Sequence, residues 1–172
     1  MQENADPGDV KKAAYAGMFG AGAVVVILDE WIKAKALQTL PDETALVHPG
    51  LIDFAIHKNF GIAFDIPFKM SFVIVLSALI GLFLLHLTAK NIQHRPVVAL
   101  SSALIIAGAA GNLYDRLVYG FTVDYIMLFG RLAINLCDLI IITGVGSLLL
   151  LGSTPWKNPA LDRSDEHASP DA

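Results

Sequence analysis

The sequence contains a single cysteine, Cys137, among its 172 residues. One cysteine excludes an internal disulfide and any metal site built from several cysteine ligands. His48 and His57 share one loop, but no third ligand residue accompanies them, so neither a metal site nor a cofactor is predicted. The lysines and arginines form no basic patch, and nucleic acid is therefore not an expected partner.

Charged residues are also scarce, since they make up 16% of the chain, whereas hydrophobic residues make up 55%. A soluble domain of this length cannot bury so much apolar surface, so part of it is expected to face lipid. A helix of about 20 residues crosses a bilayer core of about 30 Å. The sequence therefore predicts an all-α integral membrane protein with four transmembrane helices, at residues 13–28, 70–89, 96–114 and 139–156.

The first apolar run is short and follows Lys11 and Lys12, as the apolar core of a signal peptide would. No small-x-small cleavage site follows it before Asp29, so we interpret this run as a retained helix. It reaches the length of a membrane span if the helix continues through Glu30 to Leu37.

Polar segments flank and divide the apolar runs. Residues 1–12 and 157–172 are predicted to be polar tails, and the C-terminal one is expected to be disordered. Residues 13–156 form the predicted membrane domain, in which residues 38–69 connect the first two spans. Prolines in this connection argue against one continuous helix, and residues 59–66 are predicted to form short strands.

Four spans would place both tails and residues 90–95 on one side of the membrane, with residues 38–69 and 115–138 on the other. The positive-inside rule does not orient the chain, because the two sides carry equal numbers of Lys and Arg. The tails are predicted to be cytoplasmic if Lys33 and Arg116 are held in a site by acidic partners.

Polar residues gather at one end of the predicted helices. An ionised side chain in the bilayer centre costs about 2.5 to 3.5 kcal/mol, so such groups usually pair or line a wet cavity. Asp29 and Lys33 could be only a helix-surface ion pair, and Asp115 only an interfacial residue that ends a span. Two further acids have apolar neighbours, which favours a functional site. The whole set comprises Asp29, Lys33, Asn112, Asp115, Arg116, Asp124, Asn135 and Asp138.

Asp124 and Asp138 are the two acids in apolar surroundings, and two close carboxylates have a definite chemical use. They cannot both ionise cheaply in a low dielectric, so the pair holds one proton near neutral pH. The charged member can take a proton from water while the other hydrogen-bonds a peptide carbonyl. We therefore predict that they form the catalytic pair of an aspartyl protease.

Two other classes of function remain open on the residue pattern. Acids inside a membrane also serve as proton relays in transporters, although residues 70–114 contain no acid. A protein that acts only as a packing scaffold would explain the small residues at 107–110, but not the two carboxylates.

Four sequence blocks carry a resemblance to a known family. Residues 28–33, Leu-Asp-Glu-Trp-Ile-Lys, resemble its first-helix Asp and Lys, and residues 59–64, Asn-Phe-Gly-Ile-Ala-Phe, resemble its Asn-x-Gly-x-Ala-Phe block. Residues 111–116, Gly-Asn-Leu-Tyr-Asp-Arg, followed by Val-Asp-Tyr at 123–125, resemble its Gly-Asn-x-x-Asp-Arg motif and first catalytic Asp. Residues 135–138, Asn-Leu-Cys-Asp, resemble its Asn-x-Ala-Asp with the second. The chain thus resembles the lipoprotein signal peptidases, also called signal peptidase II.

The resemblance implies a role for each matching residue. Asp124 and Asp138 become the catalytic dyad, and Asp29 with Lys33 supports the site. The residues implied to shape the site or to bind the substrate peptide are Asn59, Gly61, Asn112, Arg116 and Asn135.

The resemblance also implies a substrate and a location. The substrate is a prolipoprotein, whose signal peptide is cut just before a cysteine that carries a diacylglyceryl group. The enzyme lies in the bacterial inner membrane with both termini in the cytoplasm and the active site near the outer face. The loop at residues 38–69 is extracytoplasmic and contributes a small β-sheet. Membrane lipid is an expected partner, a monomer is expected, and inhibition by cyclic peptides would make the protein an antibiotic target.

The chain departs from the family pattern at three places. The segment between the two catalytic acids, residues 125–137, is shorter than is common, so a short or differently shaped flap is expected over the site. Cys137 replaces the usual alanine, and we expect its slightly larger side chain to be tolerated. Asp65 replaces a smaller polar residue and is interpreted as a solvent-facing loop acid.

Overall fold

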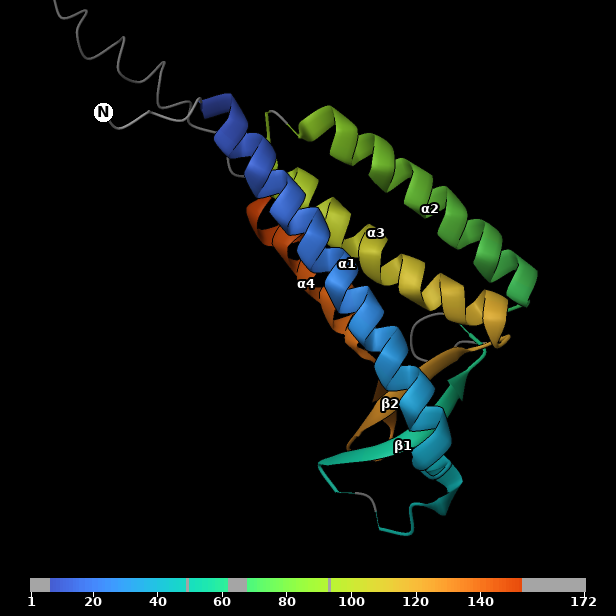
Figure 1. Cartoon of the computed structure of the whole chain (residues 1–172). Helices are drawn as coiled ribbons and strands as arrows, with labels where there is room; N and C mark the ends of the chain where they lie inside the picture. Colours follow the sequence, from blue (N-terminus) through green and yellow to red (C-terminus); the bar gives the residue numbers. More distant parts are fainter. Residues whose placement is uncertain (1–6, 49, 62–67, 93, 153–172) are drawn as a thin grey trace, which may run out of the picture.

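The computed structural model describes residues 7–48, 50–61, 68–92 and 94–152 (Figure 1). Asp65 and the predicted C-terminal tail lie outside these ranges. The described residues form four α-helices and one three-stranded sheet. In chain order the elements are α1 (Pro7–Thr39), the 3₁₀ helix η1 (Glu43–Ala45), β1 (Ile52–Asn59), α2 (Met70–Asn91), α3 (Pro96–Val118), β2 (Thr122–Leu128), β3 (Leu132–Ile134) and α4 (Leu136–Leu151).

The first three apolar runs lie in helices, and the fourth lies in a helix as far as Leu151. Helix α1 starts before its apolar run and continues to Thr39, as predicted for a helix that passes through Glu30 to Leu37. Helix α4 begins at Leu136, earlier than the apolar run suggested, because the Asn135 side chain caps its first turn. The end of the predicted fourth span, residues 153–156, lies outside the described residues.

Helices α2 and α3 are long and apolar enough to cross a membrane, and α4 is a shorter apolar helix. Most apolar side chains of α2 point outward, and only Val73 and Leu84 among them are buried. Leu79, Leu82 and Phe83 are each about 60% exposed, with values of 59%, 65% and 63%. Such a surface is typical of a lipid-facing helix and not of a core helix in a soluble protein. The structure therefore supports the prediction that this chain is a membrane protein.

Helix α3 is the central helix, and it contacts α1, α2 and α4. Small residues allow α3 and α4 to approach closely. A Cβ atom on Gly108 would lie 2.5 Å from the carbonyl oxygen of Cys137, and one on Gly144 would lie 2.8 Å from that of Ser101. This is the close backbone contact that glycine permits between membrane helices.

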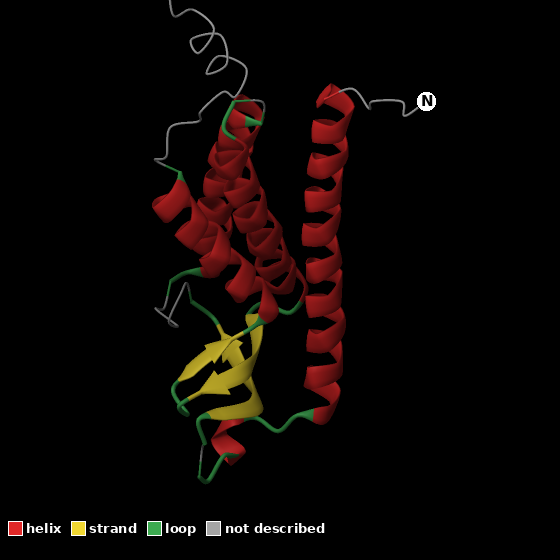
Figure 2. Ribbon diagram, turned by 90° about the vertical axis from the view of Figure 1, so that its left-hand side faces the viewer, coloured by secondary structure: helices red, strands yellow, loops and turns green. Residues whose placement is uncertain are grey.

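The sheet lies at one end of the helices, beyond the C-terminal end of α3 and beside the C-terminal part of α1 (Figures 1 and 2). The start of α1, the α2–α3 turn and the end of α4 lie at the opposite end. A small core of Ala36, Ile56, Val123 and Tyr125 joins α1 to the sheet. The predicted architecture, mostly helical with a small sheet, is confirmed.

The source of the strands differs from the prediction. The sheet is antiparallel in the order β1-β2-β3, and only β1 comes from the loop between the first two helices. Short strands were predicted at residues 59–66, but β1 precedes this range and shares only Asn59 with it. Residues 62–67 lie outside the described part of the chain. Strands β2 and β3 come from the α3–α4 connection, where the run Thr-Val-Asp-Tyr-Ile-Met-Leu at 122–128 is rich in strand-forming residues.

A tight turn joins β2 to β3. Phe129 and Gly130 both have positive φ, 54° and 62°, and the N–H of Arg131 donates to the carbonyl of Leu128. Positive φ at both central residues is the geometry of the short hairpin turns that match strand twist. The short segment at residues 125–137 therefore consists of the rest of β2, this turn, β3, the Asn135 cap and the first residues of α4.

Candidate active site

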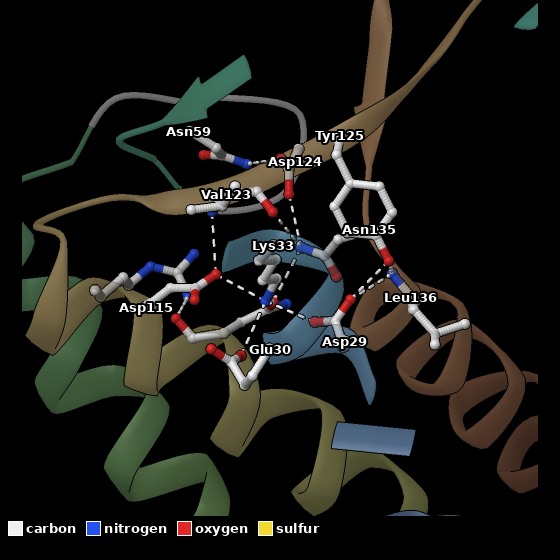
Figure 3. Close-up of polar contacts among 12 residues, drawn as sticks. Asp29, Glu30, Lys33, Asn59, Asp115, Val123, Asp124, Tyr125, Asn135 and Leu136 are labelled. Carbon is white, nitrogen blue, oxygen red and sulfur yellow. Dashed lines mark hydrogen bonds and ion pairs between the residues drawn. The ribbon is translucent and has the colours of Figure 1, made fainter. Parts of the chain in front are cut away.

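The ammonium group of Lys33 lies at the centre of a buried ionic cluster (Figure 3). Its Nζ atom is 2.7 Å from Oδ2 of Asp29 and 2.7 Å from Oδ2 of Asp115. Oε1 of Glu30 is 3.3 Å away. The side chains of Lys33, Asp29 and Asp115 are all 0% exposed. Burying one cation among several carboxylates is tolerable only because the charges contact one another directly.

Asp29 also connects α1 to β2 and to α4. Its Oδ1 atom accepts hydrogen bonds from the hydroxyl of Tyr125 at 2.9 Å and from the backbone N–H of Leu136 at 3.0 Å. The second bond satisfies an N–H in the first turn of α4, which has no partner within the helix. Burial, with the neighbouring Asp29 charge, raises the pKa of Tyr125 above its ordinary value, so its hydroxyl stays a proton donor.

Asp115 makes the corresponding connection from α3. The same Oδ2 atom that contacts Lys33 accepts the backbone N–H of Val123 at 3.0 Å. Strand β2 is therefore held against the helices by two carboxylates that share one lysine.

Asn135 lies between the ionic cluster and Asp124. Its Nδ2 atom donates to Oδ1 of Asp124 at 2.7 Å and to Oδ1 of Asn112 at 3.1 Å. Its own Oδ1 atom accepts the backbone N–H of Asp138 at 2.9 Å, while Oδ2 of Asp138 accepts the N–H of Asn135 at 3.1 Å. These reciprocal bonds form a capping box at the start of α4.

Asn112 links Lys33 to Asp138. Its Oδ1 atom lies 3.5 Å from Nζ of Lys33, and its Nδ2 atom donates to Oδ1 of Asp138 at 2.8 Å. Asn135 and Asn112 together form a continuous amide bridge between Asp124 and Asp138.

Asp124 on β2 is 1% exposed and accepts one amide hydrogen bond on each oxygen. Oδ1 is bound by Asn135, and Oδ2 is bound by Nδ2 of Asn59 at 3.1 Å (Figure 3). Burial raises the pKa of Asp124 to about 7, with a further contribution from the nearby charge of Asp138, although the amide hydrogen bonds act in the opposite direction. This carboxyl group can therefore keep its proton near neutral pH.

Arg116 connects the residues that follow β1 to α3. One terminal nitrogen donates to the carbonyl oxygen of Gly61 at 3.0 Å and the other to that of Asn112 at 3.2 Å. Its buried Nε atom has no hydrogen-bond partner among the described residues. The N–H of Gly61 in turn donates to Oδ1 of Asn59 at 3.0 Å, which orients the amide that contacts Asp124.

A model of the family described as signal peptidase (SPase) II matches residues 21–153 of this chain. The chain belongs to the signal peptidase II family. It is 37% identical to a lipoprotein signal peptidase of Syntrophomonas wolfei over 134 residues, which cover 77% of this chain and 89% of that protein. It is 31% identical to one from Sinorhizobium fredii, across 74% of this chain and 80% of the relative. The resemblance predicted from the sequence blocks is confirmed.

Two solved structures share the fold of this signal peptidase II family member. A bacterial membrane enzyme solved by the in meso method at 1.9 Å resolution has a TM-score of 0.68 and 26% identity, over 80% of this chain and 94% of the other. A second one, solved at 2.3 Å, has a TM-score of 0.70 over 91% of this chain and 94% of the other, with 24% identity. The family and the fold make this chain a membrane-embedded peptidase.

The structure brings the predicted site residues of this signal peptidase II family member together at one end of the helices. They come from α1, α3, α4, β1 and β2, from Gly61 after β1 and from Asn135, which caps α4. Asp29 and Lys33 are not a surface ion pair but the buried core of the cluster. Asp115, which could have been an ordinary interfacial acid, is the second carboxylate bound to Lys33.

Sequence reasoning missed Glu30 and Tyr125. Glu30 is one helical turn from Lys33, so its i, i+3 spacing was a usable signal for a third acid at that lysine. Tyr125 carried no such signal, because its contact with Asp29 depends on how β2 packs against α1.

Replacing Lys33 by methionine should strongly destabilise the protein. The change leaves the buried carboxylates of Asp29 and Asp115 without a cation, which costs about 3 to 5 kcal/mol for a broken buried pair. Thermal unfolding of the purified protein in detergent, followed by tryptophan fluorescence, would measure the effect. Lys35→Met is the matched control, because Lys35 is exposed on the same helix. Equal stability of Lys33→Met and the wild type would contradict the role given to the cluster.

Proposed function

We propose that this chain is an aspartic endopeptidase that removes the signal peptide from prolipoproteins. In this proposal Asp124 and Asp138 activate a water molecule, which cleaves the peptide bond just before a diacylglyceryl-modified cysteine. The names of the relatives, lipoprotein signal peptidases, support the substrate class. The chemistry is supported by the arrangement of the acids.

The observation that carries the proposal is the contrast between two kinds of acid at one site. Asp29 and Asp115 contact the Lys33 cation at 2.7 Å. Asp124 and Asp138 make no ion pair within the described part of the chain, and their oxygens are bound by neutral N–H groups instead. The first two acids are neutralised and serve the structure. The second two share a low-dielectric site without a cation in contact, which favours a single shared proton.

A single proton on the pair is what hydrolysis by water requires. The charged carboxylate takes a proton from water, and the oxygen of that water attacks the peptide carbonyl carbon. The protonated carboxyl group donates a hydrogen bond to the carbonyl oxygen as negative charge develops there. The tetrahedral intermediate then collapses, the C–N bond breaks, and a proton passes from the dyad to the leaving amine. No covalent bond to the enzyme forms.

Further residues are proposed to bind and orient the substrate. The side-chain amides of Asn59, Asn112 and Asn135 already hold the dyad, so they fix the geometry of the acids. Arg116 is the best candidate for a direct contact with the peptide, because its buried Nε donor is unused among the described residues. A carbonyl oxygen of an extended substrate would satisfy this donor.

Replacing either dyad member by asparagine should abolish cleavage. Asp124→Asn and Asp138→Asn keep the side-chain shape but remove the acid–base chemistry, so a loss of about a thousandfold or more is expected. The assay is cleavage of a diacylglyceryl-modified prolipoprotein by the purified protein. Asp53→Asn, a change at another strand acid, is the control that should remain active. Cleavage near the wild-type rate by either dyad variant would rule out the mechanism.

The pH dependence should follow the proton on the pair. Burial raises the pKa of Asp124 to about 7, so above that pH the last proton is lost and no group remains to polarise the carbonyl. At acidic pH a second proton neutralises the pair, and no base remains. A bell-shaped profile of kcat/KM is therefore expected, falling as the pH rises through about 7. Thermal unfolding at each pH serves as the control for stability, and a flat profile across the neutral range would contradict this assignment.

We further propose that all four helices cross the bacterial inner membrane and that the protein acts as a monomer. Helix α1, with 33 residues, is about 50 Å long and so exceeds the bilayer core of about 30 Å. Its excess length carries the part that packs on the sheet. Because Lys33 is neutralised by acids, it no longer counts as a free positive charge. The remaining balance favours cytoplasmic termini and an active site near the outer face, where a lipid-anchored cleavage site would lie.

Thiol labelling would test this orientation. The native cysteine, Cys137, is 0% exposed, so its background reaction should be low. Val47→Cys, at a position that is 81% exposed near the sheet, should react with a membrane-impermeant maleimide in intact spheroplasts. His94→Cys, in the exposed α2–α3 turn at the other end, should react only after permeabilisation. The reverse labelling pattern would overturn the proposed orientation.

A further inference from the structure

A histidine lies beside the dyad and has no part in the mechanism above. Nδ1 of His57, on β1, is 2.7 Å from Oε2 of Glu43 in the 3₁₀ helix η1. The two side chains are 17% and 35% exposed, so the contact lies at the edge of the fold and is reached by solvent. The contact fixes the position of the imidazole ring on the strand.

The sheet register places His57 opposite Asp124. The two residues are Cα partners in the antiparallel β1–β2 pair. Directly opposed residues project to the same face of a sheet, with Cβ atoms about 4.5 to 5.5 Å apart. Asn59, two residues along β1, lies on this face too, and its amide contacts Asp124 at 3.1 Å (Figure 3). The imidazole ring and this amide therefore flank the same carboxyl group.

The position matters because Asp124 has no cation in ion-pair contact among the described residues. Burial and the charge of Asp138 both raise the pKa of Asp124, whereas the charge of His57 acts to lower it. A positive charge within about 4 to 6 Å stabilises a carboxylate. Histidine is also the side chain whose charge changes closest to neutral pH.

Among the described residues, the charged groups near His57 also come from η1, from the residue that caps η1 and from the strand of His57 itself. Besides Glu43, they are Asp42, whose pKa is lowered mainly by hydrogen bonds from Thr44, and Lys58, whose ammonium group lies 5.8 Å from the centre of the Phe121 ring. Lys58 is the next residue on the strand, so its side chain projects from the opposite face of the sheet.

We propose that His57, held in place by Glu43, is a positioning residue that stabilises the ionised form of the dyad through Asp124. This proposal rests on the proposed function of Asp124 and Asp138. When His57 is protonated, its charge opposes uptake of a second proton by the dyad. The active, singly protonated pair then persists to lower pH than it would without this residue.

Three variants test the proposal through the pH profile of kcat/KM with a diacylglyceryl-modified prolipoprotein. His57→Gln removes the charge at all pH values, so the acid limb should move up by about half to one pH unit. His57→Lys places a positive charge at this position throughout the pH range of the assay. Its acid limb should match the wild type, and its alkaline limb should move down. Lys58→Gln removes a cation from the other face of the strand and should leave the acid limb in place.

The acid limb of the profile thus moves in His57→Gln, and the alkaline limb moves in His57→Lys. A residue with a purely structural role would not produce this pattern. An unchanged acid limb in His57→Gln, or an equal shift in Lys58→Gln, would overturn the proposal. Thermal unfolding shows whether each variant is folded, and His57→Asn replaces the glutamine variant if that one is not. If the wild-type protein itself fails to cleave the substrate, the proposed function fails instead, so the two outcomes are distinguishable.

Discussion

The Nζ atom of Lys33 lies 2.7 Å from a carboxylate oxygen of Asp29 and 2.7 Å from one of Asp115, and none of these side chains is exposed. Through Asp29 the lysine is connected to Tyr125 on β2 and to the first turn of α4, and through Asp115 to the backbone of Val123. Three helices and the central strand of the sheet therefore meet at one ammonium group. Without it, the carboxylates that join them would repel one another in a low dielectric.

This arrangement explains how one site can hold four or more acids and still have distinct roles for them. Asp29 and Asp115 contact the Lys33 cation, whereas Asp124 and Asp138 are oriented by asparagine amides, which carry no charge. An amide fixes a carboxyl group in position without forcing it to stay ionised. The network around Asn112 and Asn135 thus separates the acids that contact Lys33 from the two acids proposed to exchange a proton.

The sequence predicts the helices well because lipid imposes a simple rule: a span must be apolar and about 20 residues long. It also predicts that Asp29, Lys33, Asn112, Asp124, Asn135 and Asp138 belong to one end of the molecule. Which acid contacts which donor could not be predicted, because those contacts depend on the register of β1 against β2. Asp115 shows the limit well: a helix-end acid has the same local sequence whether it faces water or a buried lysine. The strands of the α3–α4 connection were missed because their alternation of side chains is short and includes a buried acid, Asp124.

The capping box at the start of α4 has a consequence for how the two members of the proposed dyad are positioned. Asp138 is positioned largely by Asn135, only three residues away, so its place is set by local contacts as soon as the first turn of the helix forms. Asp124 depends on Asn59, which is 65 residues distant in the chain. Asp138 is thus positioned mainly by contacts near it in the chain, together with Asn112, whereas Asp124 needs the distant Asn59 as well as the nearby Asn135. Variation in the loop that carries β1 can therefore change the surroundings of Asp124 without touching the contacts of Asp138 with Asn112 and Asn135.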